Sequence, residues 1–217
     1  MRLEEAKIKL QPMLNCRLGE LVTPEQMTDI IRAKGRTGQI IESLLGLDST
    51  NGNLDFVDGE LKTNKCDSSG NPLETMFITQ ISSRIDELLE KKDFYETLLY
   101  EKIRNLLYVP ICKEGDPEDW IILPFVHVDL RKSEYTNIRL QIEKDYYYIC
   151  ELLKKHIETS TDGFIHTSSG ELIQIRSKDS KPYTPIYSKL YKRNVSNKNH
   201  AFYFKKDFMR YINSDRY

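Results

Sequence analysis

Three residues near position 60 have the types and spacing needed to hydrolyse a phosphate ester. Asp55, Glu60 and Lys62 form the pattern D-x4-E-x-K. Neighbouring carboxylates repel each other, and a hard cation such as Mg²⁺, which prefers oxygen ligands, relieves that repulsion. A lysine beside the cation can orient the attacking water and stabilise charge on a phosphate. The pattern therefore indicates a magnesium-dependent phosphodiesterase with Asp55 and Glu60 as metal ligands.

The dipeptide Asp58-Gly59 separates two short alternating runs, LDFV and ELKT, and is typical of a two-residue β-hairpin. Such a hairpin pairs Asp55 with Lys62 and puts Glu60 on the same face, because cross-strand partners project together. The alternative is a surface hairpin with one cross-strand ion pair, worth under ~1 kcal/mol. Asp58 stays open as a substitute carboxylate, although its place in the turn favours a conformational role.

Glu42 favours the catalytic alternative. It lies in GQIIES, on a helix expected immediately before the hairpin, in a polar position among apolar residues. From there it could supply a further carboxylate to the same site. A bare D-x4-E-x-K match is common, so this additional acid strengthens the interpretation.

The elements that must position these residues alternate between helices and strands. Thr23, Pro24 and Gln26 predict a capping box that opens a helix through about Arg32. A second helix contains Ile40, Ile41, Leu44 and Leu45 and stops at Gly46. Strands are expected at 75–81, 106–112, 120–130, 171–176 and 201–205, with a long helix at 134–157 and another at the C-terminus. This order predicts an α/β (α+β) fold, a mixed sheet flanked by helices, in one domain spanning 1–217.

Charge is distributed unevenly along the 217 residues, although the net charge is only −1. From Arg176 to Tyr217 there are eleven Lys and Arg against three Asp and Glu, a net charge of +8. The preceding residues carry 21 against 30, or −9. A basic, Tyr-rich C-terminal segment suggests a polyanionic partner, because lysines that neutralise phosphates release condensed counterions. The alternative is a solvated basic face.

Composition excludes several classes of protein. With 39% hydrophobic and 30% charged residues the chain is expected to fold, and it lacks an apolar run long enough for a membrane span or a leader. We therefore expect a soluble, cytoplasmic protein. The four cysteines lie far apart, which favours reduced core thiols over zinc or disulfides, and the four histidines show no ligand spacing.

The chain also resembles a known family, the MutH-type endonucleases, which include the mismatch-repair enzyme and restriction endonucleases that cut GATC. Six segments carry the resemblance in the family's order: KGRTGQIIESLLG (34–46), DFVDGELKT (55–63), DSSGNPLETMF (67–77), KIRNLLYVPI (102–111), ELIQIRSK (171–178) and AFYFKKDF (201–208). They cover nearly the whole chain, which makes the match more specific than the short motif alone.

The resemblance implies a PD-(D/E)xK, restriction-endonuclease-like fold with two lobes around a DNA cleft. It places the family's metal-binding acids and lysine on Asp55, Glu60 and Lys62, with Glu42 as an additional catalytic acid. The spacing from Asp55 to Glu60 is shorter than the family's.

The resemblance also implies a set of residues that contact double-stranded DNA. Those outside the basic segment are Lys34, Gly35, Phe77 and Lys102. Within it, Arg176 and Lys178 match a base-reading loop whose lysine senses adenine methylation, Tyr203 matches a tyrosine near the same base, and the charge of Lys205 and Lys206 suggests further contacts. Arg176 could instead contact a phosphate without reading a base. Ser177 stands where the family has proline, which is expected to loosen the loop.

These observations leave three functions open. The first is a Mg²⁺-dependent type II restriction endonuclease that cuts GATC or a related site. The second is a mismatch-repair nicking endonuclease that acts with MutL at unmethylated or hemimethylated GATC. The third is a DNA-binding module that does not cleave, in which Glu60 or Lys62 would be expected to be replaced, and neither is.

Overall fold

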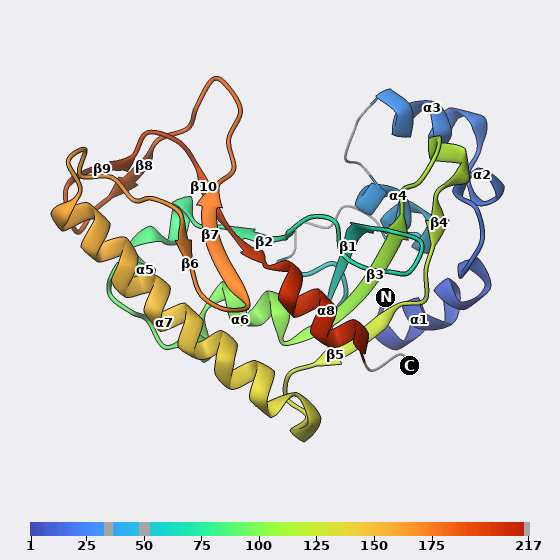
Figure 1. The fold of residues 1–217 in the computed structure, drawn as a ribbon, viewed down its shortest axis with the longest axis horizontal. Helices are drawn as coiled ribbons and strands as arrows, with labels where there is room; N and C mark the ends of the chain where they lie inside the picture. Colours follow the sequence, from blue (N-terminus) through green and yellow to red (C-terminus); the bar gives the residue numbers. More distant parts are fainter. Residues whose placement is uncertain (33–36, 48–52, 215–217) are drawn as a thin grey trace. The chain divides into compact units, whose positions relative to one another are not determined.

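The computed structural model describes residues 1–32, 37–47 and 53–214 (Figure 1). The chain divides into two compact units. Unit 1 comprises Met1–Met76, Lys102–Asp129 and Met209–Tyr217, and unit 2 comprises Phe77–Glu101 and Leu130–Phe208. The described helices of four or more residues are α1 (Leu3–Leu10), α2 (Leu18–Leu21), α3 (Pro24–Arg32), α4 (Thr37–Leu45), α5 (Ile85–Leu89), α6 (Leu98–Ile103), α7 (Thr136–Thr159) and α8 (Lys206–Ser214).

Unit 1 is built on a mixed sheet of four strands. They are β1 (Glu60–Cys66), β3 (Asn105–Cys112), β4 (Ile121–Ile122) and β5 (Val126–Asp129). β1 runs parallel to β3, with Glu60 opposite Leu106 and Lys62 opposite Tyr108. β4 and β5 both pair antiparallel with β3. The predicted strand 120–130 is thus two short strands, and Pro124, which has no N–H to donate to a ladder, lies between them.

The core of unit 1 lies between this sheet and the helices α1 and α4. Every residue of β3 is buried, as expected for a strand covered on both faces. The apolar side chains that form this core are Leu3, Ala6 and Leu10 of α1, Ile41 and Leu45 of α4, Phe56, Leu61, and Leu107, Val109 and Ile111 of β3. Burial of the 40–45 stripe is what fixes α4 beside β1.

The predicted start of α3 and the predicted end of α4 are confirmed. Thr23 Oγ1 accepts a hydrogen bond from Gln26 N at 3.3 Å, and the Gln26 side chain accepts one from Thr23 N at 2.9 Å. These reciprocal bonds form the capping box expected at the start of α3. Gly46 has φ +70°, a conformation that favours glycine, and it ends α4.

The predicted hairpin at Asp58-Gly59 is wrong. Residues 53–58 form bends, and the partner of β1 is β3. Asp58 Oδ1 instead accepts a hydrogen bond from Leu3 N at 2.9 Å, at the start of α1. A Cβ on Gly59 would lie 2.6 Å from Asn105 O and 2.8 Å from Leu3 Cδ1, so the position requires glycine for close approach to β3. The dipeptide therefore joins α1, β1 and β3 where a hairpin turn was expected.

Unit 2 contains a second sheet and a small third one. The four-stranded sheet has the order β2 (Met76–Gln80), β10 (His200–Phe204), β7 (Ile173–Ser177) and β6 (Ser168–Ser169). β8 (Ile186–Ser188) and β9 (Arg193–Ser196) form the two-stranded sheet. The mixed sheet of unit 1, with β1 parallel and β4 and β5 antiparallel to β3, agrees with the predicted mixed sheet flanked by helices, and the sheets of unit 2 are additional to it.

The long helix α7 confirms the predicted apolar stripe. It runs from Thr136 to Thr159 and packs against β6 and β7, beside which it lies in Figure 1. All six stripe residues are buried: Ile138, Ile142, Tyr146, Ile149, Leu153 and Ile157. None of the four cysteines, all of which lie in the described residues, forms a disulfide; Cys66, Cys112 and Cys150 are buried, as predicted for core thiols, whereas Cys16 is partly exposed. Within the described residues, no helix combines the length and apolarity of a membrane span.

Candidate active site

Glu60 is the centre of a compact group of charged side chains in unit 1. It is the first residue of β1, and its side chain is only 1% exposed. Its Oε1 accepts hydrogen bonds from Lys62 Nζ at 2.5 Å and from Lys102 Nζ at 2.8 Å. A buried carboxylate is costly unless it is paired, and two ammonium groups compensate this one.

Asp55 is locked to Glu60 through the main chain. Asp55 N donates to Glu60 Oε2 at 3.3 Å, and Asp55 Oδ2 accepts from Leu61 N at 3.0 Å. These two bonds hold the carboxylates of Asp55 and Glu60 beside each other at the start of β1. The structure thus brings Asp55, Glu60 and Lys62 together, but the bends of 53–58 do so in place of the expected cross-strand pairing.

Glu42 joins this group from α4. Burial raises the pKa of its carboxyl, and the nearby charge of Asp55 raises it further, while Lys62 acts in the opposite direction. A carboxyl with a raised pKa beside two acids is typical of functional sites as well as of structural ion-pair networks. Glu42, Asp55, Glu60 and Lys62 are therefore electrostatically coupled.

Lys102 was expected to contact DNA, and its contact with Glu60 was missed. It lies in the last turn of α6, three residues before the first residue of β3, and its side chain is 18% exposed. Because Lys102 and Lys62 share one oxygen of Glu60, Lys102 belongs to the same charged group. A lysine in KIRNLLYVPI offers no local sequence signal for this, because the contact depends on the parallel pairing of β1 with β3.

The donors in this group suit a hard cation. Asp55, Glu60 and Glu42 provide only carboxylate oxygens, the ligand type that Mg²⁺ prefers. In the part of the chain that the structure describes, no three acidic, histidine or cysteine side chains are arranged closely enough to hold a metal ion. Oε1 of Glu60 is engaged by two ammonium groups instead.

The expected DNA-contacting residues of unit 2 form a second group. Arg176 on β7 lies over the ring of Tyr203 on β10, with its Cζ 4.2 Å from the ring centroid. Lys178 Nζ lies 3.4 Å from the centroid of the Phe77 ring. The rings of Phe77 and Tyr203 meet edge to face at 5.8 Å. Four residues that the sequence separates by up to 126 positions therefore form one continuous cation–aromatic ladder.

The remaining expected DNA contacts are more dispersed. Lys205 Nζ donates to Gly170 O at 2.9 Å, so its ammonium group is engaged within the protein. Lys206, at the start of α8, is partly exposed. Lys34 and Gly35 lie outside the described residues.

Comparison with known proteins gives one informative result. The chain is 27% identical over 191 residues to the DNA mismatch repair protein MutH of Buchnera aphidicola subsp. Baizongia pistaciae (strain Bp), which covers 82% of this chain and 80% of that protein. The chain is thus similar to a MutH protein over most of its length. No model of a known protein family matches it.

The loop after β7 is constrained in a way that the resemblance to MutH did not predict. Ser177 was expected to loosen it in place of the proline of MutH. Asp179 Oδ2, however, accepts hydrogen bonds from Thr184 N at 2.6 Å and Asn199 N at 2.9 Å. These bonds lower the pKa of Asp179, and they tie the loop to Asn199, the residue directly before β10, and to itself at Thr184. Asp179, the acid directly after Lys178, was the sequence feature from which this constraint on the loop could have been predicted.

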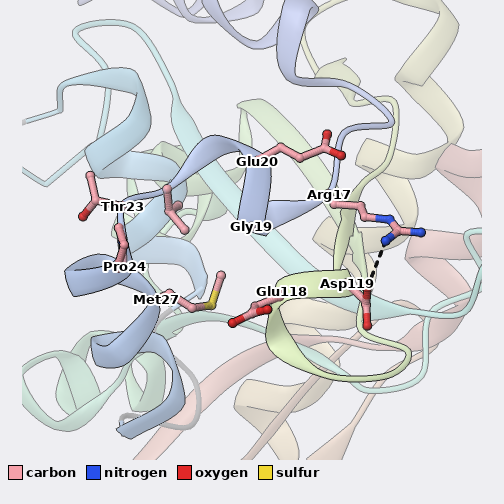
Figure 2. A pocket seen from close by; sticks show the side chains of 9 residues that line it. Arg17, Gly19, Glu20, Thr23, Pro24, Met27, Glu118 and Asp119 are labelled. Carbon is pink, nitrogen blue, oxygen red and sulfur yellow. Dashed lines mark hydrogen bonds and ion pairs between the residues drawn. The ribbon is translucent and has the colours of Figure 1, made fainter.

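A separate hollow of about 440 Å³ lies in unit 1, and among the described residues none of those expected from the MutH resemblance lines it. It is lined by α2, the start of α3 and the turn at Glu118 and Asp119. Figure 2 shows the ion pair between Arg17 and Asp119 on one side of the hollow and Thr23 on the other; the pair measures 3.3 Å. Both charged side chains are more than half exposed, so this hollow lacks the buried charges of the Glu60 group.

Proposed function

We propose that the protein is a DNA endonuclease that hydrolyses phosphodiester bonds at GATC or a related site with the help of Mg²⁺. The observation that carries this proposal is the Glu60 group, a buried carboxylate bonded to two lysines beside Asp55 and Glu42. The similarity to MutH over 82% of the chain supports DNA as the substrate.

Asp55 and Glu60 would hold the cation, because their carboxylates are the two that the main chain locks together. A bound Mg²⁺ lowers the pKa of its water and offsets charge on the phosphate. Lys62 and Lys102 can donate hydrogen bonds through Nζ to phosphate oxygens or to the attacking water, and so orient it. Glu42, whose pKa is raised, is suited to accept a proton at its carboxylate from the attacking water.

Sequence choice is assigned to the ladder in unit 2. Arg176 and Lys178 are exposed, so a base edge or a phosphate can approach their side chains. The ring faces of Tyr203 and Phe77 contact the cations of Arg176 and Lys178 and restrict their side-chain conformations before DNA binds. Less conformational entropy is therefore lost on binding. Arg suits bidentate contact with guanine O6 and N7.

We favour a restriction endonuclease, and a mismatch-repair nicking enzyme that acts with MutL is the second candidate. The name of the MutH relative favours the second candidate, since it is a mismatch repair protein. Both functions use the same chemistry. They differ in whether the protein alone cuts both strands of unmethylated DNA rapidly.

The deciding experiment digests unmethylated, hemimethylated and fully methylated plasmid with Mg²⁺ and maps the resulting ends. A restriction enzyme gives linear fragments with defined ends from unmethylated DNA in the absence of any partner. A repair enzyme gives slow nicks that MutL accelerates. A protein that cuts none of the three substrates, with or without MutL, is not an endonuclease of this type.

A further inference from the structure

Asp145 is a second buried carboxylate that the proposed chemistry does not use. It lies on α7 and is 3% exposed. Among the residues whose burial the structure describes, Glu60 and Asp145 are the only buried acids. Asp145 Oδ2 accepts hydrogen bonds from Leu172 N at 2.6 Å and Ile173 N at 3.1 Å, and Oδ1 accepts one from Gln141 Nε2 at 2.8 Å.

These bonds fix the turn between β6 and β7. A Cβ on Gly170 would lie 2.3 Å from Asp145 Cγ, so the turn approaches the carboxylate more closely than any other residue type allows. Lys205, the residue directly after β10, holds the same turn. Its Nζ donates to Gly170 O at 2.9 Å, and its N donates to Leu172 O at 2.8 Å.

The clamped turn leads directly into the strand that carries the proposed DNA-reading residues. Ile173, whose N–H binds Asp145, is the first residue of β7. Arg176 follows three residues later, about 10 Å along the strand, and Lys178 lies just beyond its end. A strand whose first N–H group and the one before it both donate to the same buried side-chain oxygen has little freedom to slide, because sliding would leave buried polar groups without their partners.

We propose that Asp145 is a positioning residue for sequence discrimination, and that Lys205 shares this role instead of binding DNA. Asp145 fixes where β7 begins, and through β7 it fixes where Arg176 and Lys178 meet the DNA. The inference rests on the proposed function, in which those two residues read the site.

The experiment compares kcat/KM for the preferred site with kcat/KM for sites altered at one base. Asp145→Ala should lower this ratio about tenfold, a loss on the scale of one good base contact. Asp145→Asn should keep the ratio near that of the parent, because Asn Oδ1 can accept from Leu172 and Ile173 while a flipped Gln141 amide accepts from Asn Nδ2. Lys144→Ala, on the neighbouring exposed position of α7, is the matched control and should leave the ratio unchanged.

The ratio separates positioning from simple destabilisation, because a smaller folded fraction lowers both cleavage rates equally. Gly170→Ala disturbs the same turn with the carboxylate intact and should also lower the ratio. Lys205→Ala should lower the ratio and leave the salt dependence of binding to random DNA unchanged. If Asp145→Ala lowers both rates equally, Asp145 is only structural and the inference fails. If the parent protein cuts no DNA, the proposed function itself fails.

Discussion

At the scale of single residues, the Glu60 group separates catalysis from DNA binding. Glu60→Ala or Lys62→Ala should reduce cleavage to background, because the proposed function places these residues at the metal, the water and the reacting phosphate. DNA affinity should change little, since the proposal assigns DNA binding to other residues. Single-turnover cleavage and fluorescence anisotropy on the same oligonucleotide measure the two quantities. Comparable losses of cleavage and affinity would show that Glu60 serves mainly to support the fold.

Asp55 and Asp58 can be distinguished by substitution. Asp55→Ala should abolish cleavage, because the Asp55 carboxylate is locked beside Glu60. Asp58→Ala should retain cleavage and lower the free energy of unfolding by about 1 kcal/mol, because its side chain satisfies Leu3 N at the start of α1. Cleavage assays and urea unfolding of both variants test this. An active Asp55→Ala with an inactive Asp58→Ala would reverse the assignment.

Lys178 is expected to respond to adenine methylation. If its ammonium group meets the adenine edge, a methyl group removes that contact and introduces a clash. Lys178→Ala should therefore cut methylated and unmethylated sites at more similar rates than the parent, with lower overall discrimination. Paired oligonucleotides that differ only in adenine methylation provide the measurement. Equal methyl sensitivity in parent and variant would indicate that Lys178 contacts a phosphate and does not read the base.

At the scale of elements, sequence patterns predicted the helix boundaries and the buried helix face that depend on interactions within a single element. The capping box at Thr23, the glycine stop at Gly46 and the buried stripe of α7 all follow from spacing within one element, and the structure confirms them. The N-terminal helix α1 was not predicted, because its buried residues, Leu3, Ala6 and Leu10, form only a narrow apolar stripe.

The Asp58-Gly59 dipeptide shows where local reasoning fails. Its residue types fit a hairpin turn, yet they serve two long-range contacts, one with Leu3 and one with Asn105. Likewise, Lys102 reaches Glu60 only because β1 and β3 pair in parallel, which no spacing within one segment encodes. The acid–lysine group could thus be named from its motif, while its geometry depended on tertiary structure.

His200, the first residue of β10, is expected to make the stability of the fold depend on pH. Burial lowers the pKa of His200, which is 4% exposed and bonds to Lys198 O through Nδ1. A histidine with a lowered folded pKa stabilises the fold above its unfolded pKa of ~6.5, and this contribution is lost as pH falls through the folded value. Between pH 7.5 and 5.5 the free energy of unfolding should fall less steeply in His200→Gln, by up to ~1.4 kcal/mol per pH unit. Urea titrations at several pH values test this, and parallel curves would exclude His200 as a source of the dependence.

At the scale of the whole molecule, the small net charge does not show how strongly positive and negative charges are separated along the chain. The value of −1 is the sum of +8 in 176–217 and −9 in the remaining residues. A uniformly neutral protein would have little long-range attraction for a polyanion. Segregated charge allows the basic segment to attract DNA while the acidic remainder includes the carboxylates proposed for the cation.

Binding to DNA should therefore weaken steeply with salt. The logarithm of the affinity should fall linearly with the logarithm of salt concentration, by ~0.9 for each phosphate contacted. Lys206, partly exposed at the start of α8, is expected to contribute one such contact. Lys206→Ala should reduce the slope by ~0.9 on specific and random DNA alike, because a phosphate contact carries no sequence information. Lys155→Ala removes the same charge from an exposed position of α7 outside the basic segment, and its slope should match that of the parent. Equal changes in both variants would mean that total charge governs binding, and an unchanged slope in Lys206→Ala would place the DNA path away from α8.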